Sequence, residues 1–350
     1  MPYQLLQGGT MRRRRSRRGR LLVSRLLPPM LIILLAGAGL WLMTDSTGEH
    51  SHAAPHRHLI SEQSAVALDA GTAPLAGGGT TPSPLAVKLQ GGVDAVHQRF
   101  RKPFGKAPRA GLLFDLDSGR VLWRYKPTKV APIASLTKMM TALVVTDQLP
   151  ARARVPVTRQ ALAYRGSGVG LLPRGKAIQL RTMLYGLLLP SGNDAAIALA
   201  QRAGGTVRRF VALMNARARA MGLLCTHFTS PSGFRDRGNH SCAADLAAIA
   251  RAVLREPRLA PIVGARSAEL PFPIKGGKLY LYNNNPLLRA AYPGTTGVKT
   301  GYTLAAGPCL VATAAHGGRR LGVVLLDSVN TGDQARRLLD KGFAALRHHR

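Results

Sequence analysis

Acidic residues and cysteines are both scarce in this 350-residue chain. It has 16 Asp and Glu against 49 Lys and Arg, a formal net charge of +33, which favours anionic partners such as nucleic acid, anionic lipid or acidic cell-wall polymers. Its three cysteines fit no C-x-x-C spacing, which excludes the common cysteine-based metal sites. No internal repeat is present, and 46% hydrophobic residues exclude a disordered chain. One sizeable domain or two small ones can therefore form.

The cysteines are expected to be thiols. Cys309 lies in an apolar run and is predicted to be buried. An oxidising compartment would permit a bridge between Cys225 and Cys242, but two small buried thiols are the preferred interpretation.

The N-terminus, residues 1–43, has the pattern of a membrane-targeting segment. An apolar stretch at 26–43, broken only by Pro28 and Pro29, follows a run of arginines, namely Arg12, Arg13, Arg14, Arg15, Arg17, Arg18, Arg20 and Arg25. A cleaved signal peptide and a retained anchor both fit its length. Either one leaves the positive end in the cytoplasm and the rest of the chain outside. We therefore expect an extracytoplasmic (periplasmic or envelope) protein that contacts the inner membrane through its N-terminus.

Residues 44–109 are predicted to be a linker. From 44 to about 92 they are rich in Gly, Pro, Ser, Thr and Ala, without a sustained helical or strand period. A histidine cluster in this segment, His50, His52, His56 and His58, has no acidic or cysteine companion. We interpret the cluster as solvated linker, and no metal or other cofactor is expected.

Residues 110–350 are predicted to form an α+β domain. Strands at 111–116 and 120–124 flank a turn, and later strands are expected at 297–303, 307–315 and 321–327. Helical spacing appears at 136–147, 181–189, 194–203, from a cap at Thr206 to before Gly222, from a cap at Ser241 to about 254, and at 334–346. The order of elements predicts a sheet that joins both ends of the domain.

Three short motifs occur in order: Ser135-x-x-Lys138, Ser191-Gly192-Asn193 and Lys299-Thr300-Gly301. Each alone is weak, since ordinary composition produces an S-x-x-K about once in a chain of this length. Their joint occurrence, each in a suitable structural setting, is much rarer. We therefore treat them together as one predicted catalytic site.

The first motif pairs a nucleophile with a base. A serine hydroxyl needs a neighbouring base to take its proton, and residues i and i+3 share one face of a helix. Lys138 is therefore expected one turn from Ser135, which gains the positive end of the helix dipole. To act as a base near neutral pH, Lys138 needs a lowered pKa, which burial and a nearby Lys299 would provide.

The other two motifs supply polar groups around that pair. Ser191 is predicted to relay a proton between Lys138, Lys299 and the leaving amine, and Asn193 to bond a substrate amide or orient Lys138. Lys299 opens a strand whose exposed edge can pair with an extended peptide. Gly301 removes a side chain that would block this approach.

The motifs and their surroundings resemble the low-molecular-weight penicillin-binding proteins, the D-alanyl-D-alanine carboxypeptidases of serine peptidase family S11. The resemblance covers about 110–346 and is carried by APIASLTKMMTA (131–142), LPSGNDAA (189–196), GVKTGYT (297–303), MNA (214–216), THF (226–228) and SPSG (230–233). It implies a β-lactamase/transpeptidase-like fold, an antiparallel sheet flanked by helices with an all-helical subdomain. Several members also carry a β-rich domain and a C-terminal anchor; neither is expected here, which makes an N-terminal anchor more useful.

The resemblance also implies a reaction. Ser135 attacks the penultimate D-alanine of a peptidoglycan pentapeptide, releases the terminal D-alanine, and forms an acyl-enzyme that water hydrolyses. The backbone N–H groups of Ser135 and Tyr302 would hold the oxyanion, and Thr300 would contact the substrate carboxylate. In some members an arginine just before the last helix also binds this carboxylate, whereas residues 329–333 contain none. β-Lactams are the expected inhibitors.

Three alternative functions are less favoured. A class A β-lactamase needs a deacylating glutamate, but Glu256 and Glu269, between the second and third motifs, lack the Glu-x-x-x-Asn context. A peptidoglycan D,D-endopeptidase would use the same residues, although the Ser-Gly-Asn-Asp context favours the carboxypeptidase. A non-enzymatic basic protein that binds envelope polymer or nucleic acid would make the three motifs accidental, so no nucleic-acid partner is expected.

Overall fold

The computed structural model describes residues 105–170, 172–234 and 237–347. The predicted membrane segment at 1–43 lies outside these ranges. So does the predicted linker as far as residue 104, including its histidine cluster. Within the described ranges, none of the helices combines the length and the apolar character needed to cross a membrane.

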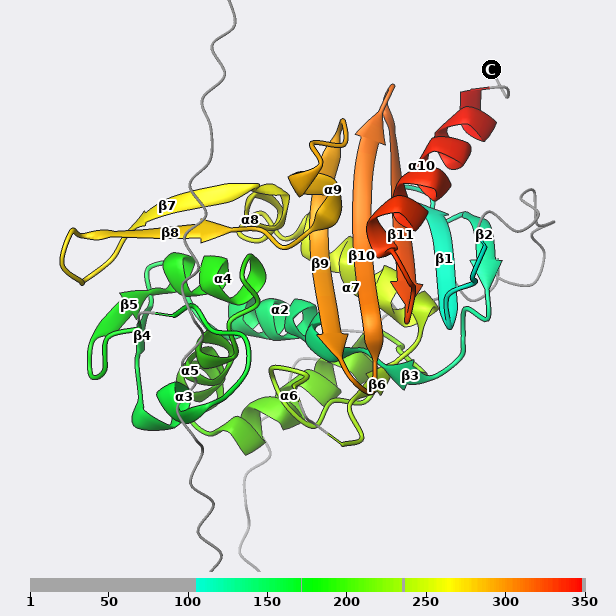
Figure 1. Cartoon of the computed structure of the whole chain (residues 1–350). Coiled ribbons are helices and arrows are strands. Elements are labelled where there is room, and N and C mark those ends of the chain that lie inside the picture. The colour runs from blue at the N-terminus through cyan, green and yellow to red at the C-terminus, as the bar shows by residue number, and fades with distance from the viewer. Residues whose placement is uncertain (1–104, 171, 235–236, 348–350) are drawn as a thin grey trace, which may run out of the picture. The chain divides into compact units, whose positions relative to one another are not determined.

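A five-stranded antiparallel sheet forms the centre of the domain, in the order β2-β1-β11-β10-β9 (Figure 1). Its strands are β1 (Ala110–Asp115), β2 (Val121–Tyr125), β9 (Thr295–Thr303), β10 (Gly307–His316) and β11 (Arg319–Leu326). β1 pairs with β11, with Leu113 opposite Val323. The prediction that one sheet joins both ends of the domain is confirmed.

Helices cover both faces of this sheet, with α10 (Thr331–Arg347) on one face and α7 (Ala243–Arg255) on the other (Figure 1). Successive side chains of a strand point to opposite faces. Val323 accordingly packs in a cluster with Leu339 of α10, whereas Val324 packs in the larger cluster with Leu246 of α7. Burial on both faces explains why β11 is an almost continuous apolar run.

A helical subdomain lies beside the edge strand β9 (Figure 1). It comprises α2 (Lys138–Gln148), α3 (Arg159–Ala163), α4 (Leu180–Leu188), α5 (Asn193–Gly204) and α6 (Val207–Ala220), with the short hairpin of β4 (Arg154–Pro156) and β5 (Ala177–Gln179). Thr206 caps α6 as predicted, since its side chain accepts a hydrogen bond from Arg209 N at 3.1 Å. The predicted fold class, an antiparallel sheet flanked by helices, is confirmed, but the subdomain is not all-helical as predicted, because it contains the β4–β5 hairpin.

The remaining elements connect the two parts. They are β3 (Ala131–Pro132), which pairs with β6 (His240–Ser241), then α8 (Ala260–Gly264), the hairpin of β7 (Ser267–Pro271) and β8 (Lys278–Tyr282), and α9 (Pro286–Arg289). The predicted cap of α7 is wrong: Cys242 occupies the N-cap position, and the Ser241 hydroxyl instead shares a 2.8 Å hydrogen bond with Thr226.

The expectation of free thiols at Cys225 and Cys242 is also wrong, because they form a disulfide. Asp245 in the first turn of α7 accepts hydrogen bonds from Cys225 N and the Thr226 hydroxyl, at 2.8 and 2.7 Å. These bonds bring the two cysteines to a Cα–Cα distance of 5.5 Å, which suits a disulfide. Cys309 is a buried thiol as predicted, and burial raises its pKa to about 11.

Candidate active site

Ser135 lies in a short 3₁₀ helix, η1 (Ala134–Thr137), which continues directly into α2. Its hydroxyl is 3.0 Å from Lys138 Nζ, so the i, i+3 spacing brings the pair together as predicted. Thr137 holds the turn, because its hydroxyl donates to Ala134 O at 2.8 Å and accepts from Asn239 Nδ2 at 2.6 Å. The first turn of a helix has no internal acceptor for its N–H groups, so the N–H of Ser135 is available to a ligand.

Lys138 is fully buried, and two carbonyl oxygens orient its amine. Nζ donates to Asn193 Oδ1 at 2.7 Å and to the backbone oxygen of Ser232 at 2.8 Å. The Asn193 amide nitrogen donates to Arg165 O at 3.0 Å, which turns its oxygen toward the lysine. Asn193 therefore orients Lys138, which was one of its two predicted roles.

Ser232 and its neighbours were given no role from the sequence. Besides its backbone contact with Lys138, its hydroxyl lies 2.8 Å from the Tyr164 hydroxyl. Gly233 follows with φ +71°, and a Cβ there would collide with Ala134 O. The sequence Ser-Pro-Ser-Gly at 230–233 could have indicated this role, because it resembles the family. The sequence alone, however, gave no chemical reason to place it beside Lys138.

Ser191 is buried and has a positive φ of +68°. Such a conformation is costly for a residue other than glycine and persists only where the surroundings impose it. Within the described ranges, its hydroxyl has no hydrogen-bond partner. Among the described residues, the Ser191 hydroxyl therefore makes no hydrogen bond to Lys138 or Lys299, and its relay role stays a prediction.

The third motif lies on β9, the edge strand nearest η1. A Cβ on Gly301 would be 3.1 Å from Ser135 N and 3.0 Å from Ile133 O, so this glycine lets the strand approach the backbone of the nucleophile. Lys299, two residues earlier, shares that face of the strand. Its side chain is fully buried and donates to Thr300 O at 2.9 Å, and desolvation lowers its pKa to about 7.

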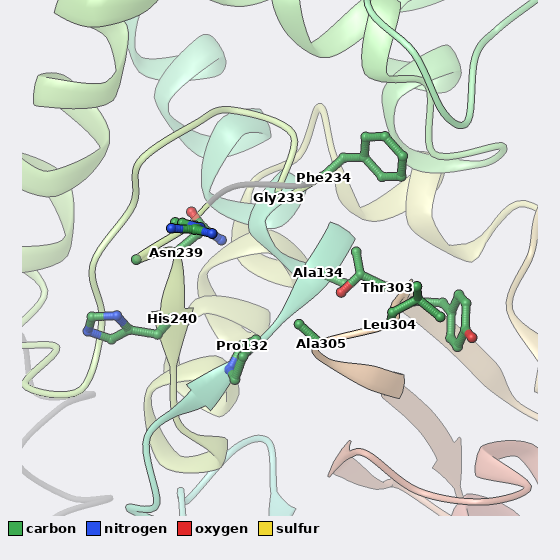
Figure 2. A pocket seen from close by; sticks show the side chains of 12 residues that line it. Pro132, Ala134, Gly233, Phe234, Asn239, His240, Thr303, Leu304 and Ala305 are labelled. Atoms are coloured by element: carbon green, nitrogen blue, oxygen red, sulfur yellow. The ribbon is translucent and has the colours of Figure 1, made fainter. Parts of the chain in front are cut away.

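Next to η1 and the end of β9 is a cavity of about 600 Å³. In Figure 2, Asn239 and His240 line one side and Thr303 and Leu304 the opposite side, with Pro132 and Ala134 between them. The cavity begins beside the nucleophile, because Ala134 precedes Ser135 in η1.

Two arginines that follow β11, Arg336 and Arg337, pair with acidic residues of their own helix. On α10, Arg336 pairs with Asp333 at 2.9 Å and with Asp340 at 3.4 Å, and Arg337 pairs with Asp333 at 2.8 Å. These are contacts between successive turns of one helix, so they do not replace the carboxylate-binding arginine that 329–333 lack.

Comparisons with known proteins agree with this geometry. The family model of the D-alanyl-D-alanine carboxypeptidases, peptidase family S11, matches residues 100–330. The D-alanyl-D-alanine carboxypeptidase DacB2 of Mycobacterium tuberculosis is 39% identical over 257 residues, which are 69% of this chain and 87% of that protein. DacF of Bacillus subtilis is 32% identical over 69% of this chain, and the match spans 63% of its own length.

A solved structure shows the same fold. The crystal structure of a D-alanyl-D-alanine carboxypeptidase from Mycobacterium tuberculosis matches with a TM-score of 0.66 and 37% identity, covering 71% of this chain and 96% of that one. The resemblance inferred from the three motifs and the sequence around them is confirmed. The chain therefore belongs to the D-alanyl-D-alanine carboxypeptidase family, peptidase family S11, and is a serine-type, penicillin-binding member of it.

Proposed function

We propose that this chain removes the terminal D-alanine from peptidoglycan pentapeptides through an acyl-enzyme on Ser135. The observation that carries the proposal is the environment of Lys138 Nζ, which contacts two carbonyl oxygens and one hydroxyl. A neutral amine has two protons and one lone pair. Two protons of such an amine can go to the oxygens of Asn193 and Ser232, which can only accept, and its lone pair can then accept the proton of the Ser135 hydroxyl.

Lys138 acts in both steps of the reaction, formation and hydrolysis of the acyl-enzyme. Lys138 takes the Ser135 proton while Oγ attacks the carbonyl carbon of the penultimate D-alanine, and the N–H groups of Ser135 and Tyr302 stabilise the oxyanion. The C–N bond then breaks, and Lys138 gives that proton to the amine of the terminal D-alanine by way of Ser191 and Lys299. Water then attacks the ester carbonyl and gives a proton to Lys138. The ester C–O bond breaks, the shortened peptide leaves, and Lys138 returns this second proton to Ser135 Oγ. Thr300 binds the carboxylate of the departing D-alanine.

The same proposal places the domain outside the cytoplasmic membrane, with the N-terminal segment as signal or anchor. Peptidoglycan is found there, and the Cys225–Cys242 disulfide suits an oxidising compartment. A fractionation experiment in which a full-length reporter fusion remained in the cytoplasm would contradict this placement.

A fluorescent penicillin tests the nucleophile. We expect covalent labelling of the wild type, no labelling of Ser135→Ala, and slow labelling of Lys138→Ala. Ser267→Ala, at an exposed position of β7, is the matched control and should label normally. An unlabelled wild type would refute the proposal.

Product analysis then identifies the reaction. A linear pentapeptide should yield free D-alanine and a tetrapeptide. Faster cleavage of cross-linked muropeptides than of linear ones would instead identify a D,D-endopeptidase.

A further inference from the structure

Three arginines converge on a small cavity that contains none of the catalytic motifs. It lies between the last turn of α7, the turn that follows β1 and the start of β11, and its lining residues are Leu116, Arg251, Leu254, Arg255 and Arg320. The three residues from α7 share one helix face, because they are three and four positions apart. A hydrogen bond from Leu116 N to Arg320 O, at 2.8 Å, holds the turn beside β11.

Arg251 is the buried member of this group, and its hydrogen bonds are incomplete. Only 4% of the residue is exposed. Its Nη2 donates to Asp117 O at 2.9 Å, but Nε and Nη1 are closed to solvent and have no hydrogen-bond partner among the described residues. Burial first, and the charge of Arg255 second, lower the pKa of the Arg251 guanidinium. A buried charged donor without a partner is unfavourable, so this side chain needs a further acceptor.

The charges around the cavity do not cancel. Arg320 is compensated, because its Nε donates to the Asp117 carboxylate at 2.9 Å. The Asp115 carboxylate accepts from two backbone nitrogens of its own turn, at 3.0 and 2.8 Å. In the part of the chain that the structure describes, Arg255 forms no ion pair. Three guanidinium groups therefore meet two carboxylates, which leaves an excess of positive charge.

The size of the cavity limits what can enter it. Its volume is about 10 Å³, which is room for one water-sized group. A water molecule would accept from the unpaired N–H groups but would leave the excess charge. One oxygen of an oxyanion supplies both an acceptor and a negative charge. A phosphate group then still has oxygens for the exposed side chains of Arg255 and Arg320, whereas a carboxylate has only one.

We propose that Arg251, Arg255 and Arg320 form a binding site for a phosphate group, which places one oxygen in the cavity. Because Nε and Nη1 of Arg251 are closed to solvent in this structure, binding requires its guanidinium group to turn toward the cavity. Inorganic phosphate and the headgroup of an anionic phospholipid share this chemistry. The site is separate from the catalytic motifs, so it does not depend on the proposed reaction.

Isothermal titration of the full chain with inorganic phosphate, at constant ionic strength, tests the site. The net charge of +33 also attracts phosphate elsewhere, so the control must remove the same charge. Arg255→Ala should weaken one phosphate site at least about tenfold, as for the loss of a charge-assisted hydrogen bond. Arg255→Lys should weaken it less, because lysine keeps the charge without the planar fork. Arg208→Ala, at an exposed position of α6, should leave it unchanged.

Thermal unfolding provides a second measurement. The wild-type midpoint should rise more with phosphate than with chloride at equal ionic strength, because a ligand that binds the folded state stabilises it. Arg251→Met has an uncharged side chain of similar length, and its midpoint should show no such difference.

Two results would overturn the inference. One is equal phosphate affinity in the wild type, Arg255→Ala and Arg208→Ala, because phosphate would then bind only through the general positive charge. The other is an equal rise of the midpoint with phosphate and chloride, which would indicate screening alone.

Vesicles of phosphatidylglycerol and phosphatidylcholine in equal amounts identify the source of the phosphate group. Vesicle binding that is weaker for Arg255→Ala than for Arg208→Ala assigns the site to a lipid headgroup. Equal vesicle binding by these two variants, together with the calorimetric difference, assigns the site to free phosphate.

Discussion

Replacing Lys299 with methionine is expected to stabilise the folded protein while it abolishes efficient acylation. The ammonium group of Lys299 is fully buried, and desolvation lowers its pKa from 10.5 to about 7. Methionine has a similar length and fills the same space without a charge. The variant thus removes a charged group whose burial destabilises the folded protein. The wild type keeps this group for function, at a cost in stability.

The magnitude follows from proton linkage. Between pH 7 and 10.5 the unfolded chain binds a proton at Lys299 that the folded protein releases, so wild-type stability rises with pH in this window; below pH 7 both states are protonated and the penalty is constant. At about 1.4 kcal/mol per pH unit of difference, the full effect is about 5 kcal/mol. Of this, about 3 kcal/mol falls between pH 6 and pH 9.

Urea unfolding of wild type and variant at several pH values between 6 and 9 measures the effect. The stability advantage of Lys299→Met should be largest at pH 6 and shrink by about 3 kcal/mol at pH 9. Lys176→Met is the control, because Lys176 is exposed just before β5 and no buried charge is removed. Its difference in unfolding free energy from the wild type should be nearly the same at every pH. If the difference for Lys299→Met were flat across this range, the reasoning from desolvation would be refuted.

Three further changes address the site itself. Asn193→Ala removes one of the oxygens that orient Lys138 Nζ, and penicillin acylation followed by stopped flow should slow by about 10²-fold. Gly301→Ala brings a Cβ within 3.1 Å of the nucleophile's backbone nitrogen, so the same assay should show a loss of at least about tenfold through displacement of η1. Replacing Cys225 and Cys242 together by serine opens a closed loop of 17 residues and should lower the free energy of unfolding in urea by about 3 kcal/mol. The last variant should also acylate more slowly, because that loop carries the carbonyl that contacts Nζ.

Each of these changes has a clear contrary result. Normal acylation by Asn193→Ala would mean that the lysine needs no orientation from α5. Gly105→Ala, where an added Cβ meets nothing within 4 Å, is the control for Gly301→Ala, and equal behaviour of the two would contradict the crowding argument. An unchanged urea midpoint after loss of the disulfide would show that the loop is held by its hydrogen bonds alone.

The sequence alone determined the features that depend on local geometry. The i, i+3 spacing of Ser135 and Lys138 sets their distance whatever the rest of the chain does. The apolar runs of β10 and β11 and the Thr206 cap are likewise readable, because strand burial and helix capping leave local patterns. The order of the predicted elements indicated the fold class, and the three motifs with the sequence around them were sufficient for the family.

Only the tertiary structure decided how the catalytic lysine is held. The two oxygens on Lys138 come from residues 55 and 94 positions away, and one of them is a backbone carbonyl that any residue type would provide. The disulfide depends in the same way on Asp245 bringing two distant turns together. The full burial of Lys299 arises from packing of β9 within the folded domain, and lysine is almost never fully buried on sequence statistics. Contacts across long sequence separations have no local period, so packing alone determines them.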